Sequence, residues 1–316
     1  MRYSVLDRPN QSHKTHQESI PYLGGLAIVI PVSLLVIVGP LIFVEDSDYS
    51  LRTALILLPA VLLALIGLFD DIKSLSASSR FLVQSVIAIG ITLYLSKLGY
   101  SVSILNNEIG NLLLSIFWLV GITNAFNFFD NLDGGAIGIT FVASLTLFVL
   151  GLLGGQYLIS STSLALAGAG LGFLLWNRHP ARIYLGDSGA LFIGFILAIS
   201  LLQFEPSVES RVASALIPVF ILALPIIDTS VAVVSRLLRG VSIFQGGRDH
   251  LSHRLISLGF SRRKTAYSLW SLSALLSSFT FLISDVSRDA ASVISLLGLL
   301  FMGLLVIWFL RIEMDT

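Results

Sequence analysis

The chain has 316 residues, of which 55% are hydrophobic and only 12% charged, and its mean hydropathy is +0.90. Soluble domains carry about 25% charged residues, so this composition excludes an ordinary soluble protein and predicts a polytopic membrane protein. The formal net charge of zero excludes the positive field that attracts nucleic acids. Cysteine is absent, which excludes disulfides and thiolate metal sites.

Ten apolar runs approach the roughly 20 residues that a membrane-spanning helix needs. The longest polar segment between them, 236–264, is too short for a soluble domain. We therefore predict an all-α fold with about ten transmembrane helices in one membrane domain, residues 1–316. The runs cover 21–44, 53–69, 81–96, 109–126, 136–153, 158–176, 188–204, 212–235, 265–284 and 290–310.

The basic residues predict how the chain is oriented in the membrane. An even number of spans places both termini on one side, and the segments on that side hold 15 of the 19 lysines and arginines. All five histidines lie there as well. By the positive-inside rule, the termini and these segments are predicted to be cytoplasmic.

Five aspartates stand at the cytoplasmic ends of apolar runs. Asp70 and Asp71 follow one run directly in GLFDDIK, and Asp130, Asp133 and Asp187 adjoin others. Partial desolvation makes an unpaired carboxylate costly there, so each needs a compensating cation. Nearby basic side chains could form structural salt bridges, but clusters on one face favour a shared divalent metal. Carboxylate and amide oxygens suit Mg²⁺.

The stretch NAFNFFDNLDGG, residues 124–135, spaces Asn127, Asp130 and Asp133 three residues apart. A helix or helix end would bring these three side chains to one side. The alternative is a helix cap followed by a turn, because Asn, Asp and Gly are turn formers.

The stretch RIYLGDSGA, residues 182–190, places Asp187 and Ser188 where the N-cap of an apolar helix belongs. A helix N-terminus is also a site for anions, and the flanking glycines allow close approach of the backbone. Tyr184 either stacks on a flat ring or belongs to the aromatic belt of the membrane interface.

The stretch GGRDHLSHRLISLGFSRRKT, residues 246–265, combines two histidines with five basic residues. This density of donors suits a diphosphate. Positive-inside bias alone explains many of these basic residues, but it does not explain the two histidines.

These motifs together carry a resemblance. FDDIK, NAFNFFDNLDG, the GDSG after RIYL, LPIIDT at 224–229 and DHLSHRLISLGFSRR, in this order, resemble the polyprenyl-phosphate N-acetylhexosamine-1-phosphate transferases of glycosyltransferase family 4. That family includes phospho-N-acetylmuramoyl-pentapeptide transferase. DRPNQSHKTHQESIPYLGG, residues 7–25, is similar to the family's first cytoplasmic segment, so the resemblance covers nearly the whole chain.

The resemblance implies a reaction and its partners. A polyprenyl phosphate, undecaprenyl phosphate in bacteria, attacks a UDP-sugar and gives polyprenyl-diphospho-sugar and UMP, with Mg²⁺ or Mn²⁺ present. This is the first membrane step in the synthesis of a cell-envelope glycan such as lipopolysaccharide or teichoic acid. The expected location is the bacterial inner membrane, with cytoplasmic active-site loops, and a homodimer is left open. The basic loop is closer to the N-acetylglucosamine branch, so UDP-N-acetylglucosamine is the expected donor.

The resemblance also implies residue roles. Asp70 matches the proposed general base, or else it orients nucleophile and metal. The other catalytic positions are Asp71, Lys73, Asp130 and Asp133; the metal ligands are Asn127 and Asp187; the substrate-binding positions are Tyr184, His250, His253 and Arg254.

Two departures and two alternatives accompany this reading. The family usually has a helix ahead of the DRPN segment, so this first helix is expected to be missing here, and Ser252 stands where many relatives have a further histidine. A Mg²⁺-dependent intramembrane prenyltransferase would explain the spacing of Asn127, Asp130 and Asp133, but neither the Asp187 segment nor the basic loop. A transporter would explain Asp228 within an apolar run, but it would cluster its charges near mid-membrane.

Overall fold

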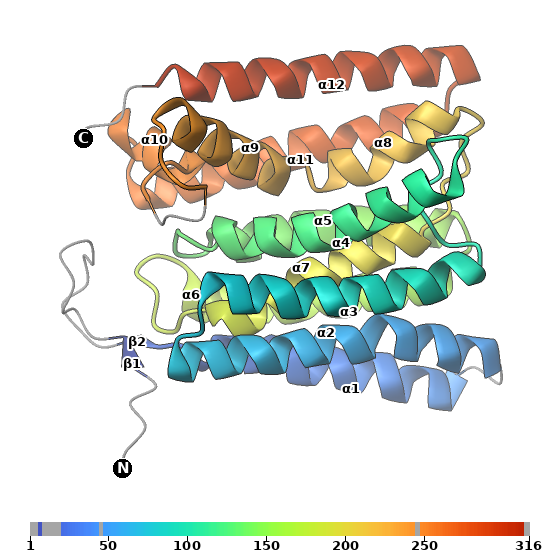
Figure 1. Cartoon of the computed structure of the whole chain (residues 1–316), viewed down its shortest axis with the longest axis horizontal. Coiled ribbons are helices and arrows are strands. Elements are labelled where there is room, and N and C mark those ends of the chain that lie inside the picture. Colours follow the sequence, from blue (N-terminus) through green and yellow to red (C-terminus); the bar gives the residue numbers. More distant parts are fainter. Residues whose placement is uncertain (1–5, 8–19, 44–46, 244–246, 313–316) are drawn as a thin grey trace.

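The computed structural model describes residues 6–7, 20–43, 47–243 and 247–312. Long helices run side by side along the molecule (Figure 1). Two antiparallel strands of two residues each, β1 (Leu6–Asp7) and β2 (Ile20–Pro21), and a short 3-10 helix, Leu23–Gly25, precede them. The helices are α1 (Leu26–Phe43), α2 (Ser47–Lys73), α3 (Ala77–Lys97), α4 (Glu108–Phe129), α5 (Gly135–Leu153), α6 (Tyr157–Asn177), α7 (Gly186–Gln203), α8 (Arg211–Ile221), α9 (Ala223–Leu238), α10 (Leu251–Ser257), α11 (Arg262–Ser284) and α12 (Arg288–Leu310).

The helices confirm the predicted all-α membrane fold. Among the described residues, eight helices are long and apolar enough to cross a membrane, and α8 with α9 forms one bent candidate. The remaining predicted run, 21–44, carries a shorter apolar helix, Leu23–Gly39. Every predicted run is therefore helical, although the straight spans are fewer than ten.

One predicted span is broken. The run 212–235 forms α8 and α9, which meet at 77° around Leu222. Pro225 has no N–H to continue the helical hydrogen bonds, and its ring excludes the carbonyl of Ile221 four residues earlier. The expectation of one continuous helix was therefore wrong at this point.

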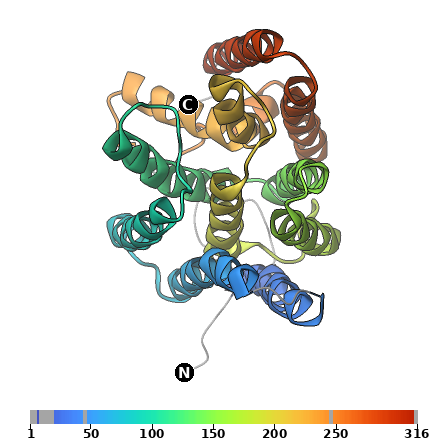
Figure 2. The same cartoon turned by 90° about the vertical axis from the view of Figure 1, so that its right-hand side faces the viewer.

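Helix α7 forms the centre of the bundle and is buried along nearly its whole length (Figure 2). A helix that is apolar on all sides is stable only where neighbours cover every face. Glycines bring these neighbours close: a Cβ atom on Gly67 of α2 would stand 2.5 Å from the backbone nitrogen of Ser188. This packing holds the last turn of α2 against the first turn of α7.

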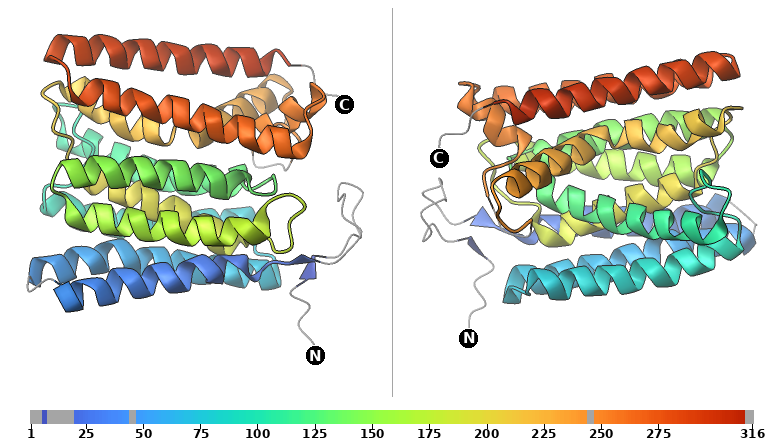
Figure 3. Two further views of the ribbon diagram at one scale, coloured as in Figure 1. Left: turned by 180° about the vertical axis from the view of Figure 1, so that it is seen from behind. Right: turned by 45° about the horizontal axis from the view of Figure 1, so that its top comes forward.

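The ends that carry the predicted site gather at one end of the bundle. The C-terminal ends of α2, α4 and α6, the N-terminal end of α7, and α10 all lie there, together with β1 and β2 (Figures 1 and 3). The C-terminal end of α12 lies at the same end. The arrangement matches the predicted topology, in which the chain starts and finishes on one side.

Candidate active site

The side chain of Asp71 caps the N-terminus of α7. Its Oδ1 accepts the backbone N–H of Asp187 at 2.9 Å, and its Oδ2 accepts that of Ser188 at 3.2 Å. The first N–H groups of a helix have no partner within the helix, and a carboxylate also favours this end of the helix dipole. The sequence predicted Asp187 as the N-cap residue, but the capping carboxylate comes from α2. Gly186 permits this, because its φ of +73° and its contact with Asp71 leave no room for a side chain.

Asp187 joins three segments of the chain. Its Oδ1 accepts the amide of Asn127, from the last turn of α4, at 2.7 Å, and its Oδ2 accepts Nη1 of Arg80 from α3. The same nitrogen of Arg80 donates to Oδ2 of Asp70 at 2.6 Å. The other oxygen of Asp70 accepts the backbone N–H of Leu75. The structure thus brings together Asp70, Asp187 and Asn127, as predicted.

Arg80 is the residue that sequence reasoning missed. It was counted only as a topology signal, yet its guanidinium lies between the carboxylates of Asp70 and Asp187. Neither carboxylate is well solvated, so the arginine supplies part of the compensating charge. Its signal in the sequence was its position ten residues after Asp70, at the start of the next apolar run.

Asp130 lies beside this cluster at the C-cap of α4. Burial of its carboxyl, together with the nearby carboxylates of Asp187, Asp71 and Asp133, raises the pKa of Asp130 to about 7. A group with this pKa is only partly ionised near neutral pH, so the cluster lacks positive charge despite Arg80.

Asp133 does not share a helix face with Asn127 and Asp130. Helix α4 ends at Phe129, and the turn that follows includes Gly134 at a φ of +71°. The carboxylate of Asp133 accepts the backbone N–H of Ala181 at 3.1 Å and contacts Nδ1 of His179 at 2.7 Å. The helical interpretation was wrong here, and the turn alternative describes this stretch.

Tyr184 and Lys73 stand at the edges of the site. The backbone N–H of Tyr184 donates to the carbonyl of Pro21 at 3.0 Å, and its ring lies 6.0 Å from that of Tyr22. Lys73 is exposed in the last turn of α2, with Nζ 5.3 Å from the centre of the Phe69 ring. The nucleotide and phosphate roles of Tyr184 and Lys73 stay predictions.

The basic loop is held by a buried aspartate. Asp228 is fully buried in α9, where it accepts the backbone N–H of Leu251 at 2.7 Å and contacts Nδ1 of His250 at 2.7 Å. Ser252 donates to Oδ1 of Asn131, which joins α10 to the turn after α4. These contacts place His250 and His253 at the same end of the bundle as the carboxylates, and they use the serine that replaces a family histidine.

Arg254 occupies a different place from the one expected for a diphosphate ligand. Only 2% of it is exposed, and Nη1 donates to the carbonyls of Phe309 and Ile312 at 2.9 Å each. Nε donates to the carbonyl of Asp249 at 3.1 Å, and Nη2 to Oγ of Ser235 at 3.0 Å. With these donors in use, Arg254 ties the loop to the end of α12.

His253 is neutral at physiological pH. Burial, with the nearby charge of His250 and Arg248, lowers the pKa of His253 from 6.5 to about 4. The unfolded chain therefore binds more protons than the folded protein between pH 4 and 6.5. The contribution of this histidine to stability is full above pH 6.5 and is lost as the pH falls toward 4.

The His253→Gln variant should consequently lose less thermal stability on acidification than the wild type. The measurement compares the drop in Tm of detergent-purified protein between pH 7 and pH 4.5 for the two proteins. An equal drop would show that the imidazole of His253 is solvated and titrates normally.

The carboxylate cluster fits a magnesium ion. Among the described residues, no group of three or more His, Asp or Glu side chains forms a preassembled metal cage. Mg²⁺ does not need one, because it usually takes one or two carboxylates and completes its shell with water and substrate phosphate. Asn127 and Asp187 offer an amide and a carboxylate side by side, and the raised pKa of Asp130 indicates a local deficit of positive charge.

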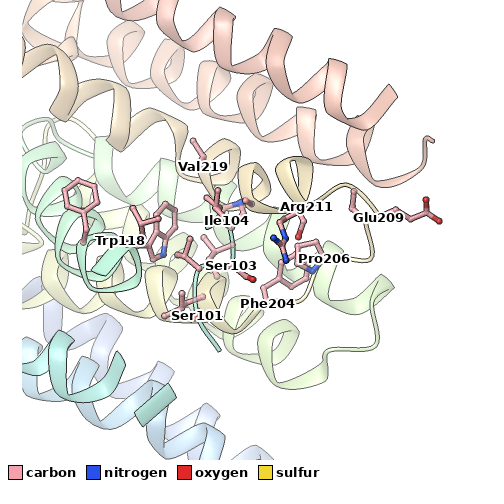
Figure 4. Close-up of a pocket in the computed structure, with 18 residues that line it drawn as sticks. Ser101, Ser103, Ile104, Trp118, Phe204, Pro206, Glu209, Arg211 and Val219 are labelled. Carbon is pink, nitrogen blue, oxygen red and sulfur yellow. The ribbon is translucent and has the colours of Figure 1, made fainter. Parts of the chain in front are cut away.

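A separate cavity of about 440 Å³ lies at the opposite end of the bundle, among α4, α7 and α8 (Figure 4). Trp118, Phe204 and Val219 contribute its apolar wall, and Arg211 and Glu209 stand beside it. None of the aspartates of the candidate site lines this cavity. The residues that the sequence predicts for the site therefore lie away from this cavity.

Fold and site together define an α-helical membrane protein with a carboxylate and arginine cluster at one end of its bundle. Residues 53–205 match the family model described as glycosyl transferase family 4. The chain is 36% identical over 299 residues, 93% of this chain and 80% of the relative, to a probable undecaprenyl-phosphate N-acetylglucosaminyl 1-phosphate transferase of Bacillus subtilis. It is 30% identical over 298 residues, 85% of this chain and 73% of the relative, to a decaprenyl-phosphate N-acetylglucosaminephosphotransferase of Mycolicibacterium smegmatis.

The undecaprenyl-phosphate alpha-N-acetylglucosaminyl 1-phosphate transferase of Escherichia coli K12 is 27% identical over 287 residues, 88% of this chain and 76% of the relative. The chain belongs to glycosyl transferase family 4, and within it to the polyprenyl-phosphate N-acetylglucosamine-1-phosphate transferases. The resemblance seen in the motifs is thus confirmed. The prenyltransferase and transporter alternatives are set aside.

Proposed function

We propose that this protein transfers N-acetylglucosamine 1-phosphate from UDP-N-acetylglucosamine to a membrane polyprenyl phosphate, giving polyprenyl-diphospho-N-acetylglucosamine and UMP. The names of the relatives support the sugar and the acceptor. The observation that carries the proposal is the cluster of Asp70, Asp187 and Asn127 at one end of the bundle, with Arg80 between the two carboxylates. The side chains of Arg80 and Asp187 are partly exposed there, so phosphate groups can approach them.

The same geometry also supports a location for the protein. The end that holds the cluster also holds most of the basic residues, which supports a cytoplasmic orientation in the inner membrane of a bacterial cell. The reaction would there begin the membrane stage of a cell-envelope glycan.

The reaction exchanges one phosphoanhydride for another. An oxygen of the lipid phosphate attacks the β-phosphorus of the donor, the bond from that phosphorus to the bridging oxygen breaks, and UMP leaves with that oxygen. Such a transfer needs positioning and charge neutralisation more than covalent chemistry. Mg²⁺ or Mn²⁺, held by Asn127 and Asp187, would supply neutralisation at the diphosphate.

The side chains of the chain itself divide the remaining work. Arg80 fixes the carboxylates of Asp70 and Asp187 relative to each other, and Asp71 fixes the start of α7. His250 has its Nδ1 held by Asp228, so Nε2 is the ring nitrogen left for the donor diphosphate. In this proposal the basic loop positions the UDP-sugar donor, and the cluster around Arg80 positions the phosphate of the lipid acceptor.

The proposal is tested with purified protein in detergent, undecaprenyl phosphate and a set of UDP-sugars. UMP release is expected with UDP-N-acetylglucosamine and should stop when either substrate is omitted. EDTA should abolish it and Mg²⁺ should restore it. Preference for another UDP-sugar would show that the assigned donor is wrong, and activity in EDTA would contradict the proposed requirement for a metal ion. No UMP release from any donor would overturn the proposed function.

Replacing Asp228 tests the role given to the basic loop. In Asp228→Asn the amide can accept only one of the two hydrogen bonds, so we expect the loop to shift and the KM for the UDP-sugar to rise roughly tenfold. The KM for polyprenyl phosphate should change little, because the acceptor is positioned elsewhere. Steady-state kinetics with each substrate varied in turn measures the split. An equal rise in both KM values would mean that Asp228 only stabilises the fold.

A further inference from the structure

A second cavity, which is polar and has a volume of about 340 Å³, lies at the same end of the bundle as the candidate active site. Its walls come from the C-terminal end of α6, the segment 178–182 and the N-terminal end of α11. Figure 3 (left) shows the start of α5 between the ends of these two helices. Of the predicted site residues only Asp133 lines this cavity, so it is distinct from the cluster around Arg80.

The cavity is basic. Arg178, Arg182 and Arg263 line it with exposed side chains. The acid in its wall, Asp133, is already engaged with His179 and Ala181. Among the residues that the structure describes, no carboxylate forms an ion pair with any of these three arginines. The cavity therefore presents three positive charges that no acid of the described chain neutralises.

The rim of the cavity has the features of a membrane interface. Trp176 and Tyr267 are each 55% exposed, and Leu175 beside them is 65% exposed. The guanidinium of Arg182 lies 5.8 Å from the centre of the Trp176 ring, and Nε of Arg263 donates to the carbonyl of His179 at 3.0 Å. Tryptophan and tyrosine at the ends of membrane-spanning helices sit at the level of the lipid headgroups. The cavity thus opens where headgroup and acyl chain meet.

We propose that this cavity binds the phosphodiester headgroup of an anionic glycerophospholipid from the surrounding leaflet. Arginine side chains form charge-assisted hydrogen bonds with phosphate oxygens, and basic pockets between transmembrane helices suit such headgroups. The exposed apolar side chains of Leu175 and Trp176 give the acyl chains a continuous path into the bilayer. A free phosphate would gain nothing from that rim. The site is independent of the transferase reaction.

Native mass spectrometry of the detergent-purified protein, titrated with phosphatidylglycerol, tests the proposal. We expect binding that phosphatidylcholine of the same chain length does not reproduce, and that inorganic phosphate in excess does not displace. Arg178→Gln and Arg182→Gln, made separately, should each weaken phosphatidylglycerol binding roughly tenfold. Arg311→Gln is the matched control, because it removes one exposed charge from the same end of the bundle, outside this cavity.

Other outcomes overturn the proposal. Equal binding of phosphatidylcholine would reduce the cavity to an apolar contact, and displacement by inorganic phosphate would make it a soluble-anion site. An unchanged affinity in both variants, or an equal loss in Arg311→Gln, would show that Arg178 and Arg182 do not bind the headgroup. Undecaprenyl phosphate serves as a fourth probe: its binding should survive both variants, which also shows that they are folded, whereas its parallel loss would identify the cavity as part of the acceptor site.

Discussion

Asp187→Asn is expected to abolish UMP release, with a loss of about a thousandfold or more in kcat, while the protein stays folded. The amide has the shape of the carboxylate and keeps one oxygen for the side chain of Asn127. It removes the negative charge that pairs with Arg80 and that a divalent cation would use. Steady-state UMP release and thermal unfolding in detergent measure the two effects separately.

The matched control for this variant is Asp285→Asn. Asp285 is an exposed acid that follows α11 at the opposite end of the bundle, so the same change of atoms and charge should leave kcat within about twofold of wild type. More than a tenth of wild-type turnover in Asp187→Asn would contradict the central place given to this carboxylate. A collapse of its Tm would show instead that the residue is chiefly structural.

The sequence was sufficient for the helices, because their signal is local. A long apolar run in a chain with so little charge has to be helical to satisfy its backbone in a bilayer. The same argument marked the aspartates, since carboxylates directly beside such runs are costly without partners. This argument marked Asp70 and Asp187, and the family resemblance added Asn127; in the structure Arg80 binds both carboxylates, and Asn127 donates to Asp187.

What the sequence did not predict depends on contacts between distant segments. The pairing of Arg80 with Asp187 spans 107 positions, and that of Asp71 with the backbone of Asp187 spans 116. A count of charges by membrane side cannot separate such a buried partner from an ordinary topology signal. Arg254 shows the reverse case: its surroundings in the sequence suggested a phosphate ligand, while its partners are backbone carbonyls more than 50 residues away.

The two errors of local structure have local causes. The bend at Leu222 follows from Pro225, and the turn after α4 follows from Gly134 in a left-handed conformation. Both residues were visible in the sequence. Hydropathy outweighed the proline, and the three-residue spacing left the turn only as an open alternative, although a single proline or glycine is enough to end a helix.

The role of Asp70 depends on where the reaction needs to place a proton. A general base must be ionised while its substrate still carries a proton. The second pKa of a phosphate monoester is near 6, so most of the lipid phosphate has lost that proton by pH 8. In the structure both oxygens of Asp70 are engaged, since one accepts from Arg80 and the other from the backbone of Leu75. A carboxylate held on both sides is suited to orienting its neighbours.

Asp70→Asn is therefore expected to be severely impaired at every pH between 6 and 9, with a ratio of mutant to wild-type kcat that stays nearly constant. If Asp70 acted only as a base, the variant would fail at pH 6 and recover as the lipid phosphate ionises by itself. Turnover is measured across this range at saturating Mg²⁺, with Arg80→Gln as the companion variant, which should show a similarly flat profile because it releases the same carboxylate. A recovery of roughly a hundredfold at high pH would establish the base and refute the positioning role.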